Sequence, residues 1–361
     1  MKMMLILRKM GWVIWTFILL GCYFGLEQSV TLSPDSDQAE KISAATKAKL
    51  AMDTIKEYRL DQSIELNDPT RGNKIVDPYE TGMIGYWMTD ITTTSGDLEA
   101  KQLSTNPNFA AMIVDMFSAI GLKPGDQVGV MLSGSFPALN ISMISAIETV
   151  GLDACIMASI GASNYGATIP EFTFYDMVKL LNDRNILSNS IDYLSLGGEN
   201  DNGEGFLEAT KNAIKSRVDE NTIWIDEDNY QENVLKRMQI FAEETPKMKA
   251  FLNVGGHQSA IGQGFASFIG QNGLLFKTKR LYSSDRGLIN RYLEQNIAVV
   301  HLIQVKDLAL TYQLPTSAAA FEVDSNQAVY YTKQAGLFWM IVPISLSVLV
   351  LGGFIIKKKE S

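Results

Sequence analysis

The chain has 361 residues, with 31 basic and 40 acidic side chains, two histidines and two cysteines. The terminal segments 1–9 and 357–361 together hold six of the basic residues and one acidic residue. Residues 10–356 therefore hold 25 basic and 39 acidic residues, a net charge near −14. Nucleic acid is therefore not an expected partner, because phosphate neutralisation needs clustered Lys and Arg. Cys22 and Cys155 both lie in apolar segments, so no structural disulfide is expected.

The N-terminal end carries an apolar segment, Met10–Leu26, after a tail of nine residues with three basic side chains. About 17 apolar residues is the lower limit for a membrane-spanning helix, and the basic tail predicts a cytoplasmic N-terminus. We predict a membrane anchor over residues 10–26 after a cytoplasmic tail, residues 1–9. Two alternatives stay open: a cleaved signal peptide, and a lipoprotein signal with lipid attached at Cys22. All three place residue 27 onward outside the cytoplasm.

The region between the two ends, residues 27–335, is predicted to fold as one extracytoplasmic α/β domain. Residues 27–38 are polar and predict a short tether, and Ala39–Tyr58 has the apolar spacing of a helix. Residues 59–80 are rich in Asn, Asp, Pro and Gly and predict a loop.

From residue 128 onward, apolar strands alternate with helices of about 12–15 residues, which indicates a mainly parallel sheet. The strands lack strict polar alternation, so we expect about six of them with helices on both faces. The predicted strands are Val128–Leu132, Ala154–Ala158, Ile191–Leu196, Thr222–Ile225, Ala250–Val254 and Ile297–Leu302. The predicted helices are Phe136–Val150, Glu171–Arg184, Gly203–Arg217, Asn229–Glu243 and Val305–Tyr312.

The C-terminal segment Gly336–Ile356 has 21 residues without a charge. At 1.5 Å per residue such a helix is about 32 Å long, close to the roughly 30 Å of a hydrocarbon core. Three lysines follow it, which predicts a second membrane span ending in a short cytoplasmic tail, residues 357–361. The sequence therefore predicts a cell-membrane protein with both termini in the cytoplasm and its main domain outside.

Ligands of open parallel sheets bind beyond the carboxyl ends of the strands, so the turns after the predicted strands are candidate sites. The turns at 133–140, 159–167 and 255–262 are rich in serine, asparagine and glycine, and the last holds one of the two histidines. We expect them to converge on one cleft, with the hydroxyl-rich residues 92–95 nearby. The residues expected there are Thr92, Thr93, Thr94, Ser95, Ser133, Ser135, Asn140, Ser163, Asn164, Gly255, Gly256 and His257.

The serines of the first turn also have a structural explanation. Ser133 or Ser135 can cap the helix that begins near Pro137, where a proline in the first turn costs no hydrogen bond. His301 lies inside an apolar strand and is expected to be structural. Neither a metal nor another cofactor is expected, because the chain has no H-E-x-x-H, C-x-x-C, EF-hand or P-loop motif.

Several stretches carry a family resemblance: Thr92–Lys101, Ser104–Ala111, Gly121–Asp126, Ser133–Asn140, Gly161–Ala167 and, more weakly, Lys306–Pro315. In these stretches the chain resembles the poly-γ-glutamate system proteins, which accompany the bacterial membrane enzymes that make and export the capsular polymer poly-γ-glutamate. The resemblance extends over residues 40–315. It implies a process, capsule polymer synthesis or export, and supplies no catalytic residues.

The resemblance, the paired anchors and the lack of a catalytic motif favour a non-catalytic accessory subunit of a poly-γ-glutamate synthesis or export complex. Its expected partners are other membrane subunits of that complex and the anionic polymer itself. Small residues in the second predicted span would permit close helix contact with such subunits: Ser345, Ser347, Gly352 and Gly353.

An enzyme is the alternative prediction. It would be an extracytoplasmic hydrolase or transferase acting on γ-glutamyl chains. Ser133 or Ser135 would be the nucleophile and His257 the base. The N–H groups of the helix that begins near Phe136 would form the oxyanion hole.

Overall fold

The computed structural model describes residues 15–17, 19–72, 74–263, 272–277, 287–316, 321–334, 336, 339, 341–343 and 345. The chain divides into two compact units. The main domain is Asp37–Tyr330, and the terminal unit combines Met1–Ser36 with Tyr331–Ser361.

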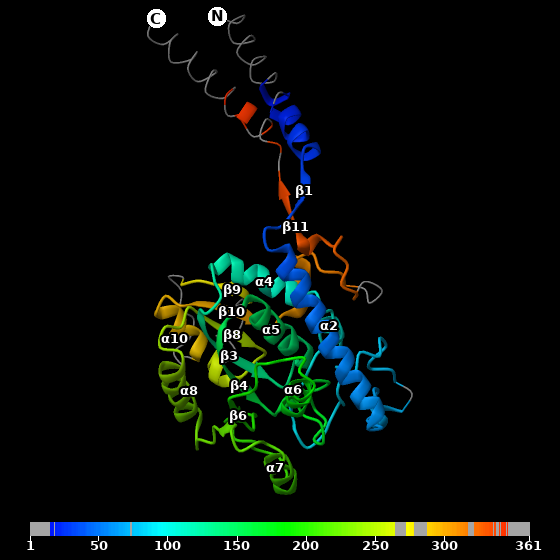
Figure 1. Cartoon of the computed structure of the whole chain (residues 1–361), viewed down its shortest axis with the longest axis vertical. Helices are drawn as coiled ribbons and strands as arrows, with labels where there is room; N and C mark the ends of the chain where they lie inside the picture. The colour runs from blue at the N-terminus through cyan, green and yellow to red at the C-terminus, as the bar shows by residue number, and fades with distance from the viewer. Residues whose placement is uncertain are drawn as a thin grey trace, which may run out of the picture. The chain divides into compact units, whose positions relative to one another are not determined.

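A seven-stranded sheet with the order β7-β6-β4-β3-β8-β10-β9 forms the centre of the main domain (Figure 1). All neighbouring strands are parallel except β9, which is antiparallel to β10. The strands are β3 (Gln127–Ser133), β4 (Asp153–Ser159), β6 (Tyr193–Ser195), β7 (Ile223–Trp224), β8 (Ala250–Val254), β9 (Gly273–Leu275) and β10 (Ala298–Leu302). The prediction of an α/β fold with a mainly parallel sheet is confirmed. The short antiparallel strand β9 has no counterpart among the predicted strands.

Helices cover both faces of this sheet. The helices α2, α4, α5 and α6 pack together on one face, and α8, α9 and α10 enclose an apolar cluster on the other (Figure 1). Their bounds are α2 (Gln38–Asp61), α4 (Phe109–Ile120), α5 (Pro137–Val150), α6 (Phe174–Asp183), α8 (Tyr230–Glu244), α9 (Gln258–Ile261) and α10 (Leu288–Glu294). Three further helices are α3 (Leu98–Ser104), α7 (Glu208–Lys215) and α11 (Val305–Thr311), and 3-10 turns lie at Pro69–Arg71 and Ala328–Tyr330.

Helix α7 begins later than the sequence pattern predicts. Gly203 and Gly205 have φ values of +71° and +88°, which belong to a turn and not to a right-handed helix. The predicted start at Gly203 was therefore wrong, and the residues just before Glu208 form turns and irregular backbone.

Aromatic packing holds β8 in the sheet. Phe251 on β8 lies 4.9 Å from the ring of Tyr292 and 5.8 Å from that of Phe241, measured between centroids. All three side chains are buried, and burying each contributes about 2–3 kcal/mol. This cluster fixes the strand that leads to His257.

The chain reverses its winding direction between β3 and β8. It leaves β3 through α5 to reach β4 on one side, and returns much later to β8 on the other side. Connections that leave two adjacent strands in opposite directions open a crevice at their carboxyl ends, where ligands of such sheets bind.

A second, two-stranded sheet lies at this edge. Strand β2 (Thr92–Thr94) runs parallel to β5 (Ala162–Ser163), with Thr94 opposite Ser163. This pairing joins the hydroxyl-rich segment before α3 to the turn that follows β4.

In the terminal unit, residues 15–17 and 19–28 are helical, and β1 (Thr31–Pro34) pairs antiparallel with β11 (Tyr331–Gln334). The predicted tether at 27–38 thus contains a strand, because its backbone finds a partner near the other end of the chain. Among the described residues, no helix has both the length and the apolarity needed to cross a membrane. Of the predicted span 10–26, residues 15–17 and 19–26 are described and helical, whereas most of the predicted span 336–356 lies outside the described residues.

Candidate functional site

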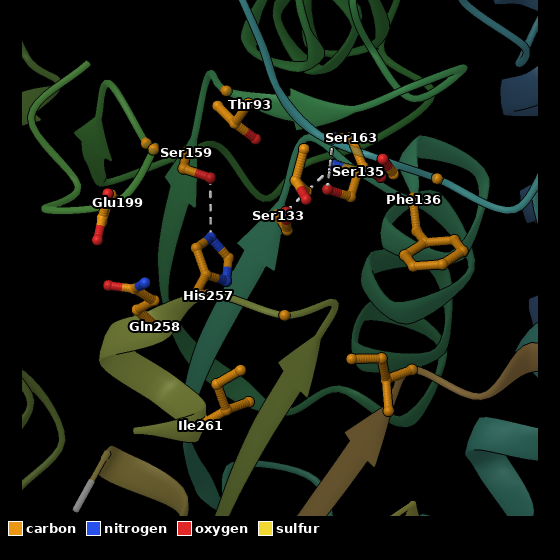
Figure 2. Close-up of a pocket in the computed structure, with 18 of the residues that line it drawn as sticks. Thr93, Ser133, Ser135, Phe136, Ser159, Ser163, Glu199, His257, Gln258 and Ile261 are labelled. Atoms are coloured by element: carbon orange, nitrogen blue, oxygen red, sulfur yellow. Dashed lines mark hydrogen bonds between the residues drawn. The ribbon is translucent and has the colours of Figure 1, made fainter. Parts of the chain in front are cut away.

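A pocket of about 720 Å³ lies at the carboxyl ends of β3, β4, β6 and β8 (Figure 2). Its walls come from the segments 93–97, 133–136, 159–163, 197–201 and 256–262, together with Lys101 and Ile303. The three turns that follow β3, β4 and β8 therefore meet at one place, beside residues 93–95.

Three adjacent strands of the sheet end in serine. Ser133 ends β3, Ser159 ends β4 and Ser195 ends β6, and Ser159 is the register partner of both others. The sheet thus presents a row of hydroxyl groups at the base of the pocket, of which Ser133 and Ser159 line it directly.

Lys101 and Ser163 form a buried contact in the pocket wall. The Nζ atom of Lys101 lies 2.7 Å from the Oγ atom of Ser163 and also donates to the carbonyl oxygen of Ser135. The same Nζ lies 3.8 Å from the centroid of the Phe136 ring. Lys101 is 2% exposed and Ser163 6%. A base is thus held against a hydroxyl group where bulk water is largely excluded.

Burial determines the charge of Lys101. Removal from water lowers the pKa of its ammonium group from 10.5 to about 7, and the nearby Asp97 opposes this only in part. Near neutral pH a large fraction of Lys101 is therefore uncharged, with a lone pair able to accept the Ser163 proton.

His257 contacts a different serine from those expected. Its Nε2 atom lies 2.9 Å from Ser159 Oγ (Figure 2). The pKa of the imidazole is lowered to about 4, mainly by burial; Asp201 opposes the shift and Arg237 adds to it. His257 is therefore neutral at physiological pH.

A buried ion pair fixes the wall contributed by the loop after β6. Asp201, at φ +61°, pairs with Arg237 on α8 and accepts a hydrogen bond of 2.8 Å from Ser195 Oγ. Arg237 also donates to Asn233 Oδ1 at 3.0 Å. The loop that carries Gly197, Gly198 and Glu199 into the pocket is thereby joined to both β6 and α8.

Of the twelve residues expected in the shared cleft, eight line the pocket: Thr93, Thr94, Ser95, Ser133, Ser135, Ser163, Gly256 and His257. The other four lie behind its wall. Asn140 Nδ2 donates to the Ser133 carbonyl at 2.7 Å, and Asn164 Oδ1 accepts from the Gly96 amide at 3.2 Å. Thr92 Oγ1 accepts from the Thr89 amide at 2.9 Å.

Gly255 lets two strands approach each other. It has φ +88°, and a Cβ atom at this position would lie 2.7 Å from the Cβ of Ser133. Its role is therefore to permit close contact between the β3 and β8 turns.

Ser133, which ends β3, accepts a hydrogen bond from the turn that follows it, and neither Ser133 nor Ser135 caps α5. Ser133 Oγ accepts from the Ser135 amide at 3.2 Å, and Ser135 Oγ accepts from the Ser163 amide at 3.0 Å. Helix α5 begins at Pro137, one residue after the predicted start, and its N-cap Phe136 carries no side-chain cap. The predicted capping by Ser133 or Ser135 was wrong, because both hydroxyl groups accept from other amides.

The sequence interpretation missed Lys101, Ser159 and Asp201 as pocket residues. Ser159 had a signal, since it is one of three serines that each directly follow an apolar strand core. His301, expected to be structural, is buried on β10 and its Nδ1 lies 2.9 Å from Asn253 Nδ2. Within the described residues, no group of three or more His, Cys, Asp or Glu side chains is placed to hold a metal ion.

A scan against protein-family models finds none that matches this chain, and a search of curated proteins finds no match either.

Proposed function

We propose that this chain is a membrane-anchored acyl-transfer enzyme of the poly-γ-glutamate system, acting outside the cytoplasm on γ-glutamyl amide bonds. The observation that carries the proposal is the buried 2.7 Å contact between Lys101 Nζ and Ser163 Oγ in the pocket wall. The reaction class follows from this geometry. The substrate class follows from the resemblance, and three of the stretches that carry it, 92–101, 133–140 and 161–167, meet at this contact.

Lys101 and Ser163 can act as base and nucleophile. Ser163 Oγ attacks the amide carbonyl carbon while its proton passes to Lys101 Nζ. When the carbon–nitrogen bond breaks, Lys101 gives that proton to the departing amine, and the acyl group remains on Ser163 as an ester. Water then yields hydrolysis, and an amine yields transfer.

The energetics of Lys101 support a catalytic role over a purely structural one. Burying an amine without a carboxylate partner is costly, and an apolar side chain of similar length would fill the same space without that cost. Strongly shifted pKa values in a pocket are typical of functional sites. The proposal therefore replaces Ser133 or Ser135 by Ser163 as nucleophile, and His257 by Lys101 as first base.

The test is the Ser163→Ala variant of the full-length protein, incubated with poly-γ-glutamate. We expect the rate of chain shortening or transfer, followed by polymer length and new amino ends, to fall by roughly 10³-fold or more. Ser145→Ala is a matched control, because Ser145 Oγ is buried on α5 without a hydrogen-bond partner among the described residues. Equal rates in wild type and Ser163→Ala would refute the proposal and leave the accessory role as the remaining candidate.

A further inference from the structure

Lys101 is enclosed by its own contacts. Its Nζ atom is surrounded by Ser163 Oγ, the Ser135 carbonyl oxygen and the Phe136 ring. A neutral amine has one lone pair and two N–H groups, so these three neighbours occupy every direction available to it. Lys101 can take the proton of Ser163 and pass it to the amine that departs beside Ser163, but it has no direction left for the molecule that must later attack the acyl group.

Ser159 and His257 form a second contact between a hydroxyl group and a base. Ser159 Oγ and His257 Nε2 lie 2.9 Å apart, and both side chains line the pocket although they are largely buried. In the tautomer with hydrogen on Nδ1, Nε2 accepts the Ser159 proton. Because burial keeps the imidazole neutral, this acceptor is available across physiological pH.

The chain places the two pairs near each other. Three residues separate Ser159 from Ser163, so their Cα atoms lie within about 14 Å. Figure 2 shows Ser133 between Ser159 on one side and Ser135 and Ser163 on the other. A pocket of about 720 Å³ is large enough for an acyl group and an acceptor together.

We infer that Ser159 and His257 activate the acceptor that removes the acyl group from Ser163. The inference rests on the proposed acyl-transfer function and assigns its second half-reaction. The acceptor is a protic nucleophile, H–X, which is water in hydrolysis and a primary amine in transfer.

The proton and bond changes of this step balance. As X attacks the acyl carbon, its proton moves to Ser159 Oγ while the Ser159 proton moves to His257 Nε2. The bond between the acyl carbon and Ser163 Oγ then breaks, and the proton passes from the imidazolium back through Ser159 Oγ and water in the pocket to the Ser163 oxygen. Overall, acyl–Ser163 and H–X give acyl–X and free Ser163.

The experiment separates the two half-reactions in the full-length protein with a short γ-glutamyl peptide p-nitroanilide. Each acylation releases one p-nitroaniline. We expect Ser159→Ala and His257→Gln to release about one equivalent in a burst, retain an acyl group on Ser163 detectable by mass, and turn over roughly 10²- to 10⁴-fold more slowly afterwards. His257→Gln removes the base but keeps a hydrogen-bonding side chain at this position. The same result in both variants would therefore not be explained by misfolding of Ser159→Ala.

Added nucleophiles test the role of Ser159 and His257 and show whether the acceptor H–X is water or an amine. Hydroxylamine attacks esters without a general base, so it should restore turnover in both variants, whereas a merely structural defect would not be rescued. Adding glycylglycine to the wild type distinguishes an amine acceptor, which gives a new peptide, from water, which gives free acid only. The Ser145→Ala control should behave as wild type in every arm.

Two outcomes overturn the inference, and they differ from each other. If Ser159→Ala and His257→Gln turn over at the control rate, or slow acylation and deacylation equally, the second pair has no separate role. If the wild type forms no Ser163 adduct and releases no p-nitroaniline, the acyl-transfer function itself fails and the inference falls with it.

Discussion

Each end of the pocket holds a serine hydroxyl group beside a nitrogen base, but different secondary-structure elements carry the two pairs. At one end, Lys101 and Ser163 come from a short helix, α3, and a two-residue strand, β5, both outside the main sheet. At the other end, Ser159 ends a central strand and His257 follows another. In both pairs desolvation removes the charge of the base, yet the pKa is about 7 for Lys101 and about 4 for His257. Desolvation therefore yields a stronger base, Lys101, and a weaker base, His257, in the same pocket.

The two ends of the pocket are also held in place by different interactions. The Lys101 end depends on close backbone approach, since a Cβ atom on Gly96 would lie 2.5 Å from the Asn164 carbonyl oxygen. The end near His257 depends on charge, because the loop facing it is held by the buried pair of Asp201 and Arg237. Substitutions can therefore damage one end while sparing the other.

The largest effect is expected from Lys101→Met, which removes the first base while filling its space. The rate of acylation, measured as the p-nitroaniline burst, should fall by roughly 10³-fold, because general bases of this kind contribute about 10²- to 10⁴-fold. A burst at wild-type rate in Lys101→Met would show that Ser163 receives its activation from another group.

Arg237→Met should cost the most stability. It leaves Asp201 buried without its partner, and breaking such a pair typically costs about 3–5 kcal/mol. Urea denaturation should show a lower free energy of unfolding for Arg237→Met, with a smaller loss for the double variant Arg237→Met, Asp201→Asn. Additive losses in the double variant would mean that the two side chains do not stabilise the loop through each other.

Gly96→Ala should weaken the Lys101 end alone. The added methyl group meets a backbone oxygen that cannot move aside easily, which should cost about 1–3 kcal/mol of unfolding free energy. Acylation should slow as Ser163 and Lys101 separate, whereas deacylation of any adduct formed should keep its wild-type rate. Equal slowing of both steps would contradict the independence of the two ends.

Per pH unit, the pH dependence of stability is the smallest effect, and it is the most specific signal. Between pH 7 and about 10 the unfolded chain binds the Lys101 proton that the folded chain has released, so stability rises with pH in this window and is lost as pH falls toward 7. The slope is at most about 1.4 kcal/mol per pH unit. The difference in unfolding free energy between wild type and Lys101→Met, measured across this window, should carry that slope. A flat difference would show that Lys101 is solvated.

Patterns in the sequence were sufficient for the sheet and for the meeting of its turns, because apolar runs and the rule for parallel sheets depend only on local composition and winding. They were not sufficient to predict the contacts of Lys101 with Ser163 and of His257 with Ser159. A lysine in the middle of a polar-looking helix predicts a surface residue, and its burial depends on Phe136 and Ser163, which are 35 and 62 residues away. The contact of His257 with Ser159 spans 98 residues.

The position of β3 between β4 and β8 also sets an order of assembly. Gln127 pairs with Asp153, 26 residues later, whereas Val128 pairs with Ala250, 122 residues later. Contacts between near neighbours in sequence close with less loss of chain entropy and form sooner. During synthesis, the ribosome releases Lys101, Ser159 and Ser163 long before His257. The nascent domain therefore passes through a stage that holds the proposed nucleophile and its proposed first base but lacks His257.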